Sequence, residues 1–226
     1  MEPNTIIGLL LWGTWVGLDL ASIAQVMINR PLVAGTIAGA ILGDAQTGIM
    51  VGVVLELFAL AVLPFGAARY PDYGLGAVAA AAAAVGAPAP DLFGLGLGVV
   101  VGLVVAYAGE IGIQLVRGRT SAEVRRHRTA LEAGDLSTIY RVHLRGIGRD
   151  ALRAIVLTAL GLGLAGIARF AHPTTVRTVV VLSAVATGVG LGTAFLGGVR
   201  MARGSRSSWT WLATGIVAGT IWVVVR

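Results

Sequence analysis

The sequence predicts an all-α fold: a polytopic membrane helix bundle with a broken or re-entrant helical hairpin and cytoplasmic arginine-rich helices. The 226 residues are 56% hydrophobic and only 12% charged, whereas soluble domains are about 25% charged. The apolar residues form long continuous runs, and only a helix or a closed barrel can satisfy its backbone hydrogen bonds inside lipid. All 17 basic residues are Arg, and they gather between these runs. Together these observations make a membrane the expected solvent.

The apolar runs divide the chain into candidate spans. The first run has no basic segment before it, lacks an A-x-A cleavage site and contains Asp19, so we expect a retained span and no signal peptide. The runs cover residues 6–28, 31–65, 74–90, 92–116, 153–170, 176–199 and 208–225.

The second run is too long for one span and is interrupted by turn-forming residues at 43–48. We expect a helical hairpin over 31–65 whose arms are too short for a full crossing. Such arms are tolerated when they pack within protein or line a wet cavity. Asp44 at the tip is therefore a structural or gating candidate.

Small residues four apart recur in several runs, and they let helix backbones approach closely. The sequence does not say whether the partner helices belong to this chain. The rows are Gly35, Gly39 and Gly43; Gly94, Gly98 and Gly102; Gly188 and Gly192; Gly215 and Gly219.

Arginine sets the predicted orientation. Residues 117–153 contain nine Arg against four acids, and cytoplasmic loops carry the excess of basic residues. The N-terminus is then outside. The expected organisation is a membrane region at 1–116, cytoplasmic amphipathic helices at 117–152 and C-terminal membrane helices at 153–226.

Two helices are expected in the cytoplasmic segment. The Thr120-Ser121-Ala122-Glu123 sequence has the capping-box pattern, which predicts a helix from Thr120 that ends near Gly134. A second helix from Asp135 aligns arginines at intervals of four, namely Arg141, Arg145, Arg149 and Arg153. This stripe either rests on anionic lipid headgroups or docks an acidic or phosphorylated partner, with Arg141, Arg145 and Arg149 as the partner-binding candidates.

Several kinds of chemistry are excluded or lack a visible site. The chain has no Cys, so it has no thiolate nucleophile or Cys-ligated metal. The three His are isolated, and no Ser-His-Asp, P-loop or H-E-x-x-H pattern occurs. The G-x-G-x-x-G at 161–166 follows no predicted strand and reads as helix packing. We therefore expect no enzyme, metal, cofactor or nucleic-acid partner.

Carboxylates in apolar runs are the functional candidates. Glu56 lies within one run, where an ionised group costs about 2.5–3.5 kcal/mol, so it should face a polar cavity or an ion-pair partner. Asp19 and Asp72 lie at span interiors or ends, and Tyr73 is near enough in sequence to join such a cavity. Carboxylates with an aromatic ring would suit a sugar. The alternatives are a structural ion pair for Glu56, a turn-forming role for Asp72 and an interfacial position for Tyr73.

The same region resembles the IIC component of the mannose/fructose/sorbose family of phosphotransferase sugar transporters. The resemblance lies in Arg30-Pro31-Leu32-Val33-Ala34, Leu42-Gly43-Asp44-Ala45-Gln46-Thr47-Gly48, Leu55-Glu56, Gly66-Ala67-Ala68 and Pro71-Asp72. It implies a permease subunit of the bacterial inner membrane that pairs with a IID subunit, moves a hexose by an elevator-like shift and delivers it to cytoplasmic IIA and IIB proteins. It further implies that Glu56 and Asp72 contact the sugar.

This chain departs from the family pattern at two places. It has Ala24-Gln25 where members commonly have Asp-Glu, and Pro64-Phe65 where they have Asn. Gln25 is thus included among the substrate-binding candidates, and Pro64 and Gly66 among the structural or gating ones. A changed substrate is one consequence.

Two other functions remain open. The first is a stand-alone secondary transporter or channel-like homo-oligomer in which Glu56 or Asp19 takes a proton or ion. The second is a scaffold whose arginine stripe recruits soluble proteins.

Overall fold

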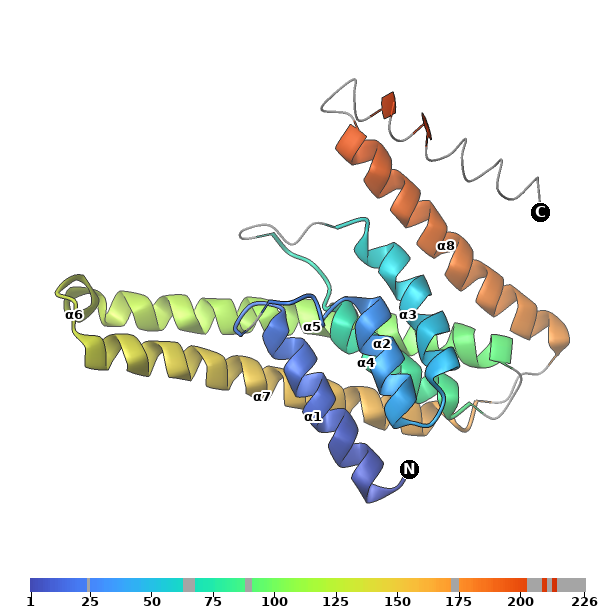
Figure 1. Ribbon diagram of the computed structural model, residues 1–226, viewed down its shortest axis with the longest axis horizontal. Helices are drawn as coiled ribbons and strands as arrows, with labels where there is room; N and C mark the ends of the chain where they lie inside the picture. The colour runs from blue at the N-terminus through green and yellow to red at the C-terminus, as the bar shows by residue number, and fades with distance from the viewer. Residues whose placement is uncertain are drawn as a thin grey trace.

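The computed structural model describes residues 1–23, 25–62, 68–87, 91–171 and 175–202, together with 209–210 and 213–214. These residues form helices, turns and loops without any strand, so the predicted all-α class is confirmed (Figure 1). The helices are α1 (Pro3–Asp19), α2 (Pro31–Ile41), α3 (Ala45–Ala59), α4 (Tyr73–Val85), α5 (Asp91–Arg126), α6 (Arg128–Glu132), α7 (Leu136–Ala168) and α8 (Val176–Ala202).

Helix α4 forms the centre of the core. Every residue from Tyr73 to Ala84 is buried, and α4 packs against α2, α3, α5 and α7. Its alanines are small enough for close approach by glycines of α5. A Cβ added at Gly98 would lie 2.7 Å from the Ala80 carbonyl oxygen, and one at Gly102 would lie 2.8 Å from that of Gly76.

The predicted small-residue faces are confirmed where they pack within this chain. Besides the α5 row, Gly35 and Gly39 of α2 lie against the backbone of α3. In contrast, a Cβ added at Gly188 or Gly192 of α8 would meet no heavy atom within 4 Å. The fourth row, Gly215 and Gly219, lies outside the described residues.

Helices α2 and α3 form the predicted broken hairpin, with arms of 11 and 15 residues. Gly43 turns the chain with a φ of +88°, which glycine adopts without a steric penalty. Asp44 then caps α3 by accepting a hydrogen bond from the Thr47 amide at 3.0 Å. Arms this short cannot cross about 30 Å of hydrocarbon.

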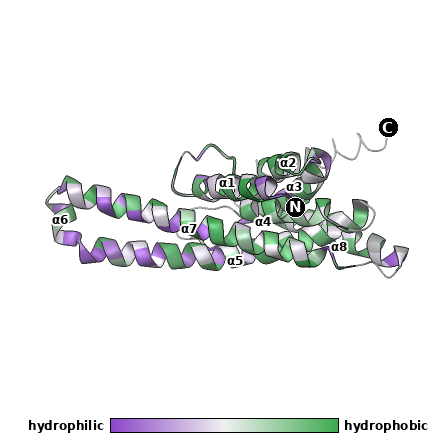
Figure 2. Ribbon diagram, turned by 90° about the horizontal axis from the view of Figure 1, so that it is seen from below, coloured by the Kyte–Doolittle hydropathy of each residue, from purple (hydrophilic) through white to green (hydrophobic). Residues whose placement is uncertain are grey.

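Three other helices are long and apolar enough to cross a membrane: Leu92–Arg126, Leu136–Ala168 and Val180–Arg200. The first and second run side by side and antiparallel, joined by α6 at one end (Figure 1). Their half near α6 is mostly hydrophilic, and their other half is mostly hydrophobic (Figure 2). By the arginine rule, we expect the α6 end to be cytoplasmic.

The predicted helix start at Thr120 is wrong, because α5 continues from Asp91 to Arg126 without interruption. The sequence changes polarity at Arg117 but contains no proline there, so the change in solvent does not break the helix. Likewise α7 passes through Arg153. The predicted boundaries after 116 and after 152 therefore fall inside α5 and α7.

The turn between the two cytoplasmic helices does follow the sequence. Gly134 has a φ of +74°, and Asp135 caps α7 by accepting from the Ser137 amide at 3.1 Å. Hydrogen bonds from Thr138 and then Ser137 hold the pKa of the Asp135 carboxyl below its ordinary value.

Candidate functional site

The charged side chains of the apolar segments meet at one end of the short helices. There the C-terminal ends of α1 and α3 lie beside the N-terminal ends of α2 and α4, and α5 and α7 pass behind them. Three carboxylates bind groups here: Asp19 binds the α1–α2 loop, Glu56 binds Arg30 at the start of α2, and Asp72 binds Arg153 of α7.

Glu56 forms an ion pair with Arg30, and its other carboxylate oxygen accepts from the Leu32 amide at 3.2 Å. It therefore holds the C-terminal part of α3 against the start of α2. Helix α3 ends at Ala59, so Glu56 lies one turn from its end, although the apolar run continues to Phe65. The ion-pair alternative is thus present in this conformation, and the predicted sugar contact stays a prediction.

Asp72 lies at the N-terminus of α4, where it caps the helix by accepting from the Leu75 amide at 3.2 Å. Its second oxygen accepts from Arg153 at 2.6 Å. Arg153 also donates to Asp150 at 2.7 Å and to the Gly17 carbonyl at 3.1 Å. One arginine thus connects α1, α4 and α7 at a site where its side chain is 4% exposed.

The position of Arg153 corrects the predicted arginine stripe. Its aliphatic stem packs near Gly112 of α5, so this fourth member of the stripe belongs to the core. Arg145 and Arg149 both pair with Glu123 of α5, and Arg141 donates to the Thr138 hydroxyl at 3.0 Å. The first three arginines therefore stay in the cytoplasmic region, and their partner binding stays a prediction.

Asp19 organises the loop between α1 and α2. Its two oxygens accept from the Val26 amide at 2.7 Å and the Asn29 amide at 3.1 Å. Gln25 in the same loop is exposed and has a φ of +54°. Asp19 thus binds two backbone amides of the loop, and Gln25 is turned toward solvent.

A small cavity lies beside the Glu56 ion pair, between the α1–α2 loop, the end of α3 and the start of α4. It has a volume of about 60 Å³ and is bordered by Asn29, Arg30, Tyr70 and Tyr73. This is room for a few water molecules, whereas ligand pockets usually measure about 300–1,000 Å³. The Tyr73 ring contacts Phe58 at 6.5 Å between centroids.

The structure brings together only part of the predicted site. Tyr73 and the Arg30 partner of Glu56 border the small cavity, whereas the Asp72 carboxylate binds Arg153. Asp44 is at the opposite end of the hairpin, capping α3. Pro64 and Gly66 lie outside the described residues.

Two arginines at the site were missed as site residues. The sequence indicates Arg30 only as part of the family motif and Arg153 only as part of the arginine stripe. The signal for Arg153 was the Asp150-x-x-Arg153 spacing, which places a carboxylate one helical turn from the cation.

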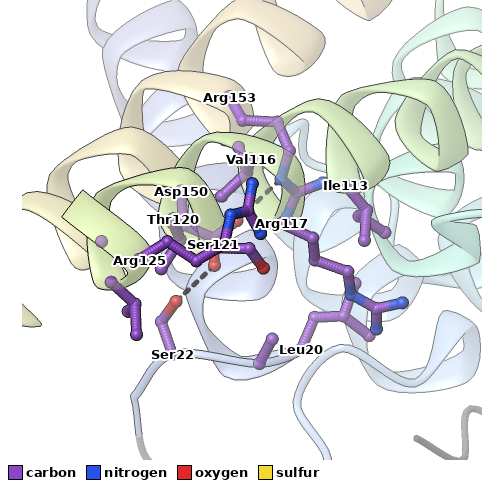
Figure 3. Close-up of a pocket in the computed structure, with 13 residues that line it drawn as sticks. Leu20, Ser22, Ile113, Val116, Arg117, Thr120, Ser121, Arg125, Asp150 and Arg153 are labelled. Atoms are coloured by element: carbon purple, nitrogen blue, oxygen red, sulfur yellow. Dashed lines mark hydrogen bonds and ion pairs between the residues drawn. The ribbon is translucent and has the colours of Figure 1, made fainter. Parts of the chain in front are cut away.

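A larger cavity of about 500 Å³ lies next to the small one, and Leu20 borders both. It lies between the α1–α2 loop, α5 and α7 (Figure 3). Among the described residues, no group of three or more His, Asp or Glu side chains could hold a metal ion.

The fold and site define a class: a polytopic α-helical membrane protein with a short broken hairpin and ion pairs at the helix ends, as in membrane transporters. The chain belongs to the family of the sorbose-specific IIC component of the PTS (phosphotransferase system), whose sequence profile matches residues 4–191. The components of this family are bacterial inner-membrane proteins, which confirms the predicted multi-pass location.

Relatives in several bacteria are similar to this chain. The sorbose-specific EIIC component of Klebsiella pneumoniae is 31% identical over 160 residues, which is 69% of this chain and 58% of the relative. The mannose-specific EIIC component of Escherichia coli K12 is 30% identical, over 62% of this chain and 52% of the relative. The fructose permease IIC component of Bacillus subtilis is 33% identical, over 58% and 48% respectively. The chain thus spans about half the length of the curated relatives it matches.

Two solved structures share the fold. One, described as the structure of a membrane protein, aligns with a TM-score of 0.74 at 23% identity, covering 97% of this chain and 87% of that chain. The other is a chain of the mannose transporter ManYZ in complex with microcin E492, with a TM-score of 0.62 at 22% identity and the same coverage.

Proposed function

We propose that this chain is the EIIC-like permease subunit of a phosphoenolpyruvate-dependent sugar phosphotransferase system and translocates a hexose. The observation that carries the proposal is the family match over residues 4–191. The mannose, sorbose and fructose relatives support a hexose as substrate. In this proposal the subunit is non-catalytic by itself, and the phosphoryl group comes from IIA- and IIB-like cytoplasmic proteins.

The proposed partner in the membrane is a IID-like subunit, which makes the working unit a hetero-oligomer. The fold shared with a chain of the mannose transporter ManYZ supports this. Gly188 and Gly192 of α8 are four residues apart, and a Cβ added at either would meet no heavy atom within 4 Å, which supports close packing of an additional helix there. Transport by an elevator-like shift would move one group of helices against the other.

The sugar contacts are proposed at the small cavity, around Glu56, Arg30 and Tyr73. The cavity has too little room for a hexose in this conformation, so opening must separate the C-terminal end of α3 from the start of α2 and of α4. Separation would break the Arg30–Glu56 ion pair and release a guanidinium and a carboxylate for sugar hydroxyls, with the Tyr73 ring beside them. Asp72, Asp19 and Gln25 are proposed as further contacts after this rearrangement.

The test is the Glu56→Gln variant, measured by sugar uptake in cells that carry the IIA, IIB and IID proteins. The amide has nearly the same size but no charge, so we expect uptake to fall at least about tenfold, as for loss of a charged hydrogen bond. The matched control is Glu132→Gln, which removes the carboxylate of an exposed ion pair with Arg128 and should transport normally.

Membrane level and thermal stability in detergent are measured for both variants, because Glu56 also pairs with Arg30. Normal uptake by Glu56→Gln would show that Glu56 does not contact the sugar. Uptake that is independent of the IIB protein would contradict the phosphotransferase assignment itself.

A second candidate function is a secondary transporter coupled to protons or ions. The cluster of Asp72 and Asp150 around the single Arg153 favours it, since the cluster has a net negative charge and ionisable residues within membrane segments mark ion pathways. Glu56 or Asp19 would be the coupling residue. Uptake that collapses with the proton gradient and ignores the phosphoryl donor would select this function.

A further inference from the structure

The larger cavity lies where the apolar part of α5 gives way to its arginines. Its volume is about 500 Å³, which is within the usual range for small-molecule sites. The apolar run of α5 ends at Val116, so the cavity lies at the depth of the cytoplasmic lipid headgroups. Soluble molecules of the cytoplasm and lipid headgroups can both reach this depth.

Two arginines of the cavity, Arg117 and Arg125, make no ion pair with a carboxylate of the described residues. Arg117 donates to the Ala68 carbonyl at 3.0 Å and to the Tyr70 hydroxyl at 3.2 Å, and it lies over the Tyr70 ring at 5.4 Å. All three contacts are with uncharged groups. Arg125 is exposed at the mouth, and in the described part of the chain it has no ion pair within 4.0 Å.

Asp150, the carboxylate in the cavity wall, already accepts hydrogen bonds from two side chains. Asp150 accepts from Arg153 at 2.7 Å through one oxygen and from the Ser22 hydroxyl at 2.5 Å through the other (Figure 3). Arg153 is in turn paired with Asp72. Asp72, Asp150 and Arg153 together carry one negative charge, so with Arg117 and Arg125 this part of the cavity has a net charge of +1.

Hydroxyl groups lie between these two cations. Thr120 and Ser121 border the cavity three and four residues after Arg117 and are on the same face of α5 as Arg125. At 1.5 Å per residue, the two arginines are about 12 Å apart along the helix axis, with the hydroxyls midway. Guanidinium groups and hydroxyls together recognise phosphate oxygens.

We propose that this cavity is a binding site for a phosphate ester, with Arg117, Arg125, Thr120 and Ser121 as its ligands. The ester is carried either by an anionic phospholipid headgroup or by a soluble organic phosphate. Apolar side chains, including Leu20, Ile113 and Val124, form the remaining wall and would contact the body of the molecule. The proposal is independent of sugar transport, and its test measures binding alone.

The experiment titrates the purified chain in neutral detergent with three probes: phosphatidylglycerol, glycerol 3-phosphate and inorganic phosphate, with phosphatidylcholine as the zwitterionic reference. Arg125→Gln should weaken binding of the preferred probe about tenfold, as for loss of a charged hydrogen bond. Arg126→Gln removes the same charge from the adjacent residue, which does not border the cavity, and should change binding less than about twofold, since exposed charges contribute little.

A second pair of variants tests the space without changing charge. Gly146 borders the cavity, and a Cβ added there would meet no heavy atom within 4 Å. Gly146→Leu should occupy part of the cavity and weaken binding, whereas Gly148→Leu, which also meets no atom within 4 Å, should leave binding intact.

Binding of phosphatidylglycerol identifies a lipid site, and binding of glycerol 3-phosphate alone identifies a soluble ester; both support the proposal. The proposal is overturned if none of the phosphate probes binds better than phosphatidylcholine. Equal losses in Arg125→Gln and Arg126→Gln, or full binding by Gly146→Leu, would also overturn it.

Discussion

Replacing Arg153 by Met should destabilise the protein strongly, because this side chain connects three helices. It makes contacts of 2.6 Å to Asp72, 2.7 Å to Asp150 and 3.1 Å to the Gly17 carbonyl. Methionine fills part of the same volume but leaves both carboxylates without a cation. Removing one partner of a buried ion pair costs about 3–5 kcal/mol.

That cost corresponds to a fall in Tm of about 6–20 °C, at 2–4 °C per kcal/mol for a chain of this size. The assay is thermal unfolding in detergent, followed by tryptophan fluorescence. Arg153→Lys keeps the charge but loses the planar fork, so it should melt between the wild type and Arg153→Met. Arg141→Met is the control, because Arg141 is exposed and contacts only a hydroxyl among the described residues.

A double variant separates charge from packing. In the Arg153→Met background, Asp72→Asn removes one of the uncompensated charges and should recover part of the lost Tm. The reasoning is refuted if Arg153→Met melts within about 2 °C of the wild type, or if Asp72→Asn lowers the Tm of that background further.

Two further predictions concern the hairpin, and both are measured as Tm in the same detergent. Gly39→Ala should lower the Tm by several degrees, because its Cβ would lie 2.5 Å from the Asp44 carbonyl oxygen and 2.7 Å from the Gly48 Cα, both backbone atoms. The control is Gly163→Ala, whose Cβ would meet no heavy atom within 4 Å and should not lower the Tm. Equal changes in Tm would contradict the close packing at Gly39. Asp44→Ala should cost about 1 kcal/mol through loss of the cap on the Thr47 amide, and Asp44→Ser should restore most of it; an unchanged Tm for Asp44→Ala would show that the cap contributes nothing.

The sequence was sufficient for the fold class, the hairpin and its tip, because these follow from local properties. An apolar run interrupted by Gly43 and Asp44 can only turn there, and glycines four apart on α5 can only present a flat face. The glycine at 134 and the cap at Asp135 were predictable for the same reason.

The sequence did not predict how far the helices continue beyond the membrane boundary. A change from apolar to charged residues at Arg117 marks a change of solvent, but a helix needs a backbone reason to end, and α5 has none. The residues from Thr120 to Glu123 match a capping box in type and spacing, but they lie within α5 and begin no helix.

The site residues were predicted by type but not by partner. Glu56, Asp72 and Asp19 were expected to face one cavity, yet each has its own nearby donor: Arg30, Arg153 and two loop amides respectively. Which donor lies nearest depends on how α1, α2, α4 and α7 pack, and that information is not local in sequence.

The uninterrupted course of α5 and α7 also has a mechanical consequence. Gly112 touches the Arg153 stem, and the 14 residues from there to Arg126 make a rigid arm of about 21 Å. A displacement of α6 would therefore be transmitted along α5 and α7 toward the contacts that Arg153 makes with α1, α4 and α7.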